Sequence, residues 1–200
     1  MQGTSYIPRG RHRLNLMKLL AFLLFIFFRH FPGNHEEDES KIIDDYVGNL
    51  GKRRIPVPGD GHCMLHAFSL GLREKDDQGD YSVESLITTI KNELSENKQF
   101  YSDFDAIKEE DLNAYFKNKD YNLNLVDLIP NVVANALKTS ISILLVQDGQ
   151  VSTRSILPKT QKKVEKTICV CKIGNHYDVI VDEEAASDLK IEGEPDIVVC

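Results

Sequence analysis

Apolar residues recur at helical spacing through much of the chain between residues 41 and 137. The clearest stretch runs from Ser82, a residue type that commonly caps helix N-termini, to Asn97, and one of its faces is apolar. That face consists of Val83, Leu86, Ile90 and Leu94. The same spacing predicts further helices over residues 41–50, 109–118 and 123–137.

The pattern also predicts which side chains of these segments enter the core. In the helix over residues 41–50, the expected buried stripe is Ile42, Ile43, Tyr46 and Leu50. In the helix over residues 123–137, Pro130 marks a start or a kink. Four aromatic residues have a spacing more typical of core packing than of a docking surface: Tyr101, Phe104, Tyr115 and Phe116.

Beyond residue 140 the period changes from helical to strand-like. Residues 141–146 form an apolar run, and Asp148-Gly149 predicts a tight hairpin turn into residues 151–157. A second hairpin is expected from residues 167–173 and 176–181. Helices followed by paired strands predict an α+β fold, with helices packed around a small, mostly antiparallel sheet.

A candidate nucleophile follows a glycine-rich turn. Gly59 and Gly61 flank Asp60, and a helical apolar pattern begins at Cys63. A thiol in the first turn of a helix lies near unpaired N–H groups and the positive end of the helix dipole, both of which favour the thiolate. We therefore expect Gly61 and His62 to form an oxyanion loop beside Cys63.

A candidate base lies far along the chain. A lone cysteine more often packs as a small hydrophobic residue, so nucleophilic chemistry requires a partner. His176 begins a strand-like run, and Asp178, two positions later, shares its face of the strand and can orient the imidazole. Asp60 is the alternative third member of the triad, or a support for the loop.

The two motifs together resemble the ovarian tumour (OTU) family of cysteine proteases. The resemblance rests on Asp60-Gly61-His62-Cys63 and His176-Tyr177-Asp178, and it covers roughly residues 55–181. Residues 127–137 also resemble the penultimate helical region of that family. Two positions depart from the family pattern, because His62 stands where Asn is most common and His66 where Arg is common.

The resemblance implies an OTU-like, papain-type fold and a thiol-dependent deubiquitinase that needs no cofactor or metal. Its partners would be ubiquitin or polyubiquitin chains, with other ubiquitin-like modifiers also open. Two alternatives remain at this point. One is a catalytically silent module that keeps the fold to bind ubiquitin, and the other is an OTU-type peptidase module of a mobile element or a virus.

Length and charge fit one domain with flanking segments. The chain has 200 residues, 42% of them hydrophobic, which is enough for one core. We expect an N-terminal segment and acidic linker over residues 1–40, a catalytic domain over 41–183 and an acidic tail over 184–200. A net charge of -7 argues against a nucleic-acid-binding surface.

The cysteines favour a reducing compartment, and hence the cytoplasm. The four cysteines, at positions 63, 169, 171 and 200, have neither the density nor the spacing of a disulfide scaffold. Cys169 and Cys171 alternate with apolar residues in a strand-like run, which favours buried or half-buried strand residues over a metal site, since a metal needs about four ligands.

The N-terminal segment leaves membrane association open. Its apolar run, residues 19–28 (LLAFLLFIFF), follows a basic stretch as in a signal sequence, but it is shorter than the roughly 20 residues that span a bilayer. No small-residue cleavage site follows it. A membrane-surface anchor, a cryptic signal and a gene-model artefact are the three readings of this run.

Overall fold

The computed structural model describes residues 35–76, 78–104, 107–121, 125–159, 166–187 and 189. The expectations for residues 19–28 and for most of the acidic tail lie outside these ranges. The contacts group the described residues from Glu36 onward into one compact unit. Within the described residues, no helix is both long and apolar enough to cross a membrane.

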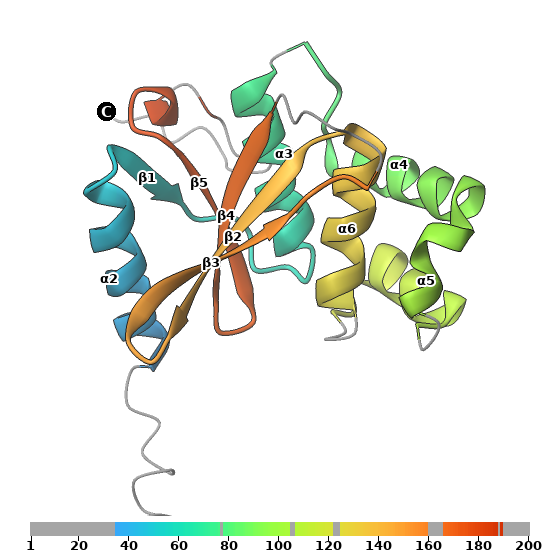
Figure 1. The fold of residues 1–200 in the computed structure, drawn as a ribbon, viewed down its shortest axis with the longest axis horizontal. Coiled ribbons are helices and arrows are strands. Elements are labelled where there is room, and N and C mark those ends of the chain that lie inside the picture. The colour runs from blue at the N-terminus through green and yellow to red at the C-terminus, as the bar shows by residue number, and fades with distance from the viewer. Residues whose placement is uncertain are drawn as a thin grey trace, which may run out of the picture. The chain divides into compact units, whose positions relative to one another are not determined.

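A five-stranded sheet occupies the centre of this unit (Figure 1). Its strands are β1 (Lys52–Ile55), β2 (Ser140–Gln147), β3 (Gln150–Ile156), β4 (Thr167–Ile173) and β5 (His176–Asp182). They lie in the order β1-β5-β4-β2-β3, and each neighbouring pair is antiparallel except β2 and β4, which are parallel. The predicted α+β fold with a mostly antiparallel sheet is therefore confirmed.

Helices cover both faces of the sheet. They are α2 (His35–Gly48), α3 (Cys63–Lys75), α4 (Val83–Glu96), α5 (Glu109–Asn118) and α6 (Leu125–Leu137), with short 3-10 helices η1 (Lys98–Phe104) and η2 (Ala185–Ser187). Figure 1 shows α2 on one side of the sheet and α4, α5 and α6 grouped on the other. Helix α3 packs against β4 and β5, so its first residue lies close to the strand that carries His176.

The core divides between the two faces because successive strand residues point in opposite directions. On β5, Tyr177, Val179 and Val181 enter the large cluster beneath α3, α4 and α6, whereas Ile180 faces the smaller cluster beneath α2. Helix α2 contributes Ile43 and Val47 to that smaller cluster. The strand that carries the candidate base is thus covered on both faces.

Several local predictions are confirmed. Ser82 caps α4, and its hydroxyl accepts a hydrogen bond from the Ser85 amide at 3.3 Å. The turn between β2 and β3 consists of Asp148 and Gly149, both with positive φ as a tight hairpin requires. Cys169 is half-buried and Cys171 is buried in β4, as their alternation predicted.

Helix α2 departs from the predictions in two respects. It begins at His35, so residues 35–40, which we expected to form a linker, are helical. Tyr46 and Leu50 are 39% and 56% exposed, so their predicted burial is wrong. The helix ends at Gly48 and faces the sheet through Ile43, as predicted, and through Val47, one turn later. In α6, Pro130 lies inside a helix that begins at Leu125, not at its start.

Candidate active site

Cys63 is the first residue of α3, as the pattern predicted. The chain leaves β1 at Ile55 and passes through Pro56-Val57-Pro58 before the turn at residues 59–61. Cys63 is 5% exposed, and its backbone occupies the first helical position. Its side chain therefore belongs to the first turn of α3, where the backbone N–H groups have no partner within the helix.

Gly61 is required by the packing of the neighbouring helix. Its φ is +88°, and a Cβ at this position would overlap the carbonyl oxygen of Lys119. Lys119 follows α5 and has a left-handed conformation with φ of 61°. The end of α5 therefore lies directly on the turn that precedes Cys63.

Asp60 organises this turn. Its carboxylate accepts hydrogen bonds from the His62 amide at 2.9 Å and from His66 Nε2 at 3.2 Å, and it pairs with Lys119. Partial burial acts to raise the pKa of Asp60. The hydrogen bonds from Lys119, His62 and His66 outweigh this effect and hold the pKa well below its usual range. Asp60 thus remains a carboxylate that ties the loop to α3 and α5.

The side chain of His62 anchors the loop to α5. It is 4% exposed, and its Nε2 is 2.7 Å from the Tyr115 carbonyl oxygen. The two rings also contact edge-to-face, with centroids 5.1 Å apart. The sequence predicts His62 only as a loop residue, because a contact across 53 positions has no local signal. The position where the family commonly has Asn is here a buried packing residue.

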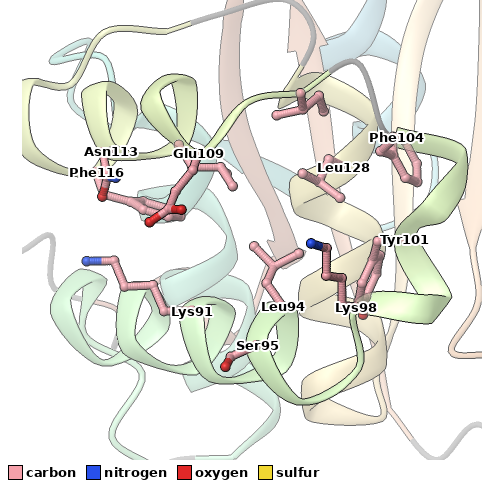
Figure 2. A pocket seen from close by; sticks show the side chains of 12 residues that line it. Lys91, Leu94, Ser95, Lys98, Tyr101, Phe104, Glu109, Asn113, Phe116 and Leu128 are labelled. Atoms are coloured by element: carbon pink, nitrogen blue, oxygen red, sulfur yellow. The ribbon is translucent and has the colours of Figure 1, made fainter.

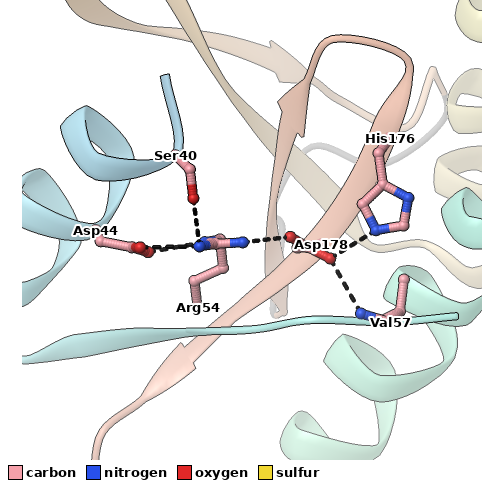
Figure 3. A network of polar contacts seen from close by, with 6 residues as sticks. All are labelled: Ser40, Asp44, Arg54, Val57, His176 and Asp178. Carbon is pink, nitrogen blue, oxygen red and sulfur yellow. Dashed lines mark hydrogen bonds and ion pairs between the residues drawn. The ribbon is translucent and has the colours of Figure 1, made fainter. Parts of the chain in front are cut away.

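His176 and Asp178 are in direct contact at the start of β5. His176 Nε2 lies 2.9 Å from Asp178 Oδ1, and Asp178 is 3% exposed (Figure 3). An ionised carboxylate only accepts hydrogen bonds, so Nε2 carries the proton and donates it. Nδ1 is then the nitrogen that exchanges protons with a substrate, and it lies on the side of Gly59, where a Cβ would be 3.9 Å away.

The surroundings of His176 favour its protonated form. A hydrogen bond to Asp178, and next an interaction with the Cys63 thiol, raise the pKa of His176 to about 10 against the opposing effect of burial. The imidazole of His176 thus has two side-chain partners, Asp178 and Cys63. The structure therefore brings Cys63, His176 and Asp178 together.

Asp178 and Asp60 have different surroundings. Asp178 contacts His176, and it also accepts hydrogen bonds from Arg54 Nη1 at 2.7 Å and the Val57 amide at 3.0 Å. Burial acts to raise the pKa of Asp178, but the bonds from His176 and Arg54 outweigh it and lower the pKa. Asp60 binds His66 and the loop instead. Of the two carboxylates, the geometry favours Asp178 as the partner of the imidazole.

Cys63, His176 and Asp178 are not among the lining residues of the pocket that the structure describes. A pocket of about 660 Å³ is formed among α4, η1, α5 and α6, and Tyr101, Phe104 and Phe116 are among its lining residues (Figure 2). Tyr101 and Phe116 are buried, in keeping with their predicted core role. Within the described residues, no group of three His, Cys, Asp or Glu side chains is arranged to hold a metal ion.

Comparison with known proteins gives a structural match without a sequence match. No protein-family model matches the chain, and no curated protein matches it. In structure, the chain is similar to the OTU domain of OTUD1, with a TM-score of 0.57 and 19% identity over 72% of this chain and 95% of that one. It is also similar to an OTU deubiquitinase from Wolbachia pipientis wMel bound to ubiquitin, with a TM-score of 0.50 and 13% identity over 68% of this chain and 98% of that one.

These observations define an α+β domain in which a helix headed by cysteine packs on a mixed sheet. More particularly, the chain has the fold of OTU domains, as its two motifs indicated. At 19% and 13% identity, this likeness concerns the fold alone.

Proposed function

We propose that this chain is a deubiquitinase that hydrolyses isopeptide bonds after the C-terminus of ubiquitin. The observation that carries the proposal is the alignment of His176 by Asp178, at 2.9 Å, with the pKa of the imidazole raised by both Asp178 and Cys63. Asp178 alone would suffice to hold a histidine with a purely structural role, whereas His176 also interacts with a thiol at the N-terminus of a helix. The OTU fold supports the same reading, since a similar structure is described as bound to ubiquitin.

The proposed reaction proceeds in two steps. In the first, Cys63 Sγ attacks the carbonyl carbon of the isopeptide bond, and the imidazolium of His176 gives its Nδ1 proton to the leaving lysine amine. In the second, neutral His176 takes a proton from water, and the resulting hydroxide attacks the thioester. Ubiquitin leaves with a free carboxylate, and Cys63 returns as a thiolate beside an imidazolium.

A backbone amide at the start of α3 would stabilise the oxyanion of each tetrahedral intermediate. The His62 amide already donates to Asp60, so it is not free to donate to the oxyanion. The amide of Cys63, at the first position of α3, is the donor that we assign to the oxyanion. In this arrangement Asp60 acts on the loop and not on the imidazole.

The partners that we propose are ubiquitin and polyubiquitin chains. A thiol nucleophile requires a reducing compartment, so we place the activity in the cytoplasm. Other ubiquitin-like modifiers are the alternative substrates.

The direct test is cleavage of isopeptide-linked diubiquitin by the purified protein. We expect wild type to release monoubiquitin, Cys63→Ala to release none and Cys169→Ala, a substitution of a half-buried cysteine in β4, to match wild type. Binding of diubiquitin without cleavage by wild type would favour the silent binding module instead.

A further inference from the structure

Arg54 links the candidate centre to a helix on the far side of the sheet. It lies on β1, which pairs with β5, and its Nη1 donates to Asp178 Oδ2 at 2.7 Å. The rest of the guanidinium faces α2. Nε and Nη2 bind the two oxygens of Asp44 at 2.7 and 2.8 Å, and Nη2 also donates to Ser40 Oγ at 2.6 Å. Figure 3 shows these groups in a row from α2 through Arg54 to Asp178 and His176.

The Asp178 carboxylate depends on donors from outside its own strand. With 3% exposure it has almost no contact with water, and a buried carboxylate must be compensated by hydrogen bonds or an opposite charge. Arg54 supplies the charge and holds Oδ2, while the Val57 amide helps to hold Oδ1. Oδ1 is also the atom that binds His176, so the direction of the carboxylate fixes the direction of the imidazole.

Helix α2 also contacts the turn between β4 and β5. Its Glu39 accepts a hydrogen bond at 3.2 Å from the amide of Gly174, in the turn that leads into His176. Ile43 of α2 is fully buried against the sheet, which keeps the helix in place. Helix α2 thus contacts the turn before His176 directly and the Asp178 carboxylate through Arg54.

We propose that Arg54 is a positioning residue, held by Ser40 and Asp44 of α2, that fixes the Asp178 carboxylate so that it aligns His176. Its effect on turnover rests on the proposed function, whereas the alignment of the imidazole can be measured without any substrate. A guanidinium suits this role because its planar fork binds two carboxylates at once.

The pKa of His176 distinguishes a positioning role of Arg54 from a purely electrostatic one. If Arg54 only neutralises Asp178, its removal leaves the carboxylate in place without that compensating positive charge, and the pKa of His176 rises. If Arg54 positions Asp178, its removal lets the carboxylate turn away, and the pKa of His176 falls as the hydrogen bond weakens. The ionisable groups around the pair are Cys63 on α3, Cys171 on β4, Arg54 on β1 and, beyond it, Asp44 on α2.

The experiment compares Arg54→Gln with Arg53→Gln in the full chain. Arg53 is the exposed neighbour on β1, so the control removes the same charge from the same strand. The pKa of His176 is followed by NMR titration of its ring, and kcat and KM are measured on a ubiquitin substrate. For Arg54→Gln we expect the pKa to fall by about one unit or more and kcat to fall roughly 10- to 100-fold, with KM within about twofold of wild type.

Arg53→Gln should change neither quantity. Asp44→Asn, on the solvent side of the network, should act in the same direction as Arg54→Gln with a smaller effect, and it keeps the test decisive if Arg54→Gln does not fold. A pKa of His176 that rises or stays constant, with kcat retained, would overturn the proposal. If wild type cleaves no ubiquitin linkage while Arg54→Gln still lowers the pKa of His176, the proposed function fails and the positioning role stands.

Discussion

Gly61 occupies both a backbone conformation and a space that a side chain cannot share. Its φ is +88°, and a methyl group there would meet the Lys119 carbonyl at the end of α5. Gly61→Ala must therefore displace either the loop or the helix end, and with it the Cys63 amide that we assign to the oxyanion. We expect a loss of kcat/KM on the order of 100-fold, measured with a fluorogenic ubiquitin substrate.

The matched control is Gly51→Ala, in the turn between α2 and β1. Gly51 also has a positive φ, 68°, but a Cβ there has open space around it. This variant should lose some thermal stability and keep its activity. Equal activity losses in the two variants would show that backbone strain matters and that contact with α5 does not.

Asp178→Asn tests the source of the high pKa of His176. The hydrogen bond to the carboxylate is the main reason that this pKa lies near 10, so imidazolium persists well above neutral pH. A neutral amide stabilises imidazolium less, and the pKa should fall toward its ordinary value near 6.5. The alkaline limb of the kcat/KM profile should then move to lower pH, because above this pKa the imidazole has no proton to give to the leaving amine.

Asp182→Asn, an exposed position on the same strand, is the control and should leave the limb unchanged. We expect the loss of turnover in Asp178→Asn to be smaller than in His176→Ala, which should cost on the order of a thousandfold or more. If the alkaline limb of the kcat/KM profile stays in place in Asp178→Asn and moves to lower pH in Asp60→Asn, Asp60 is the residue that orients the imidazole.

Local sequence carried much of the information about individual site residues. Cys63 at the head of a helix and Asp178 two positions after His176 both follow from spacing within one element. Arg54 and Tyr115 do not, because their bonds to Asp178 and His62 join segments that are 124 and 53 positions apart. Such partners depend on how the elements pack, which a single sequence does not specify.

At the scale of elements, α2 offers the sharpest test of packing. Ile43 is fully buried beneath the sheet, whereas Tyr46, three residues later, is 39% exposed. Ile43→Ala leaves a cavity and should lower the free energy of unfolding by about 2–5 kcal/mol, measured by chemical denaturation. Tyr46→Ala should stay within about 0.5 kcal/mol of wild type. Comparable losses in the two variants would support the predicted stripe, in which Ile43 and Tyr46 are both buried.

The helix boundaries show where sequence patterns were sufficient. The predicted helix over residues 109–118 coincides with α5, in which Leu112, Tyr115 and Phe116 recur at helical spacing and face the core. For α2 the acidic residues from Glu36 to Glu39 suggested a linker, yet acidic side chains are favourable in the first turn of a helix. The contact of Glu39 with Gly174 adds a long-range reason that the pattern did not contain.

At the scale of the whole molecule, both hairpins were predictable and their arrangement was not. Each hairpin is joined by a two-residue turn with a clear sequence signature. The parallel pairing of β2 with β4 joins the hairpins, and β1 is added beside β5 at the edge. These long-range pairings decide that Arg54 on β1 lies beside Asp178 on β5.

The proposed function requires that one of the described cysteines differ from the others in reactivity. Burial raises the pKa of Cys169 to about 11 and that of Cys171 to about 12, so both remain thiols near neutral pH. Cys63 lies at a helix N-terminus and interacts with His176. A substrate that brings an electrophile to the centre should therefore be captured at Cys63.

The assignment of Cys63 as the nucleophile is tested most directly by mass spectrometry. The protein is analysed after reaction with ubiquitin that carries a thiol-reactive group at its C-terminus. We expect a single covalent adduct, mapped to Cys63 by peptide analysis, which is absent in Cys63→Ala and unchanged in Cys171→Ala. An adduct on Cys169 or Cys171, or one that persists in Cys63→Ala, would contradict the assignment of Cys63 as the nucleophile.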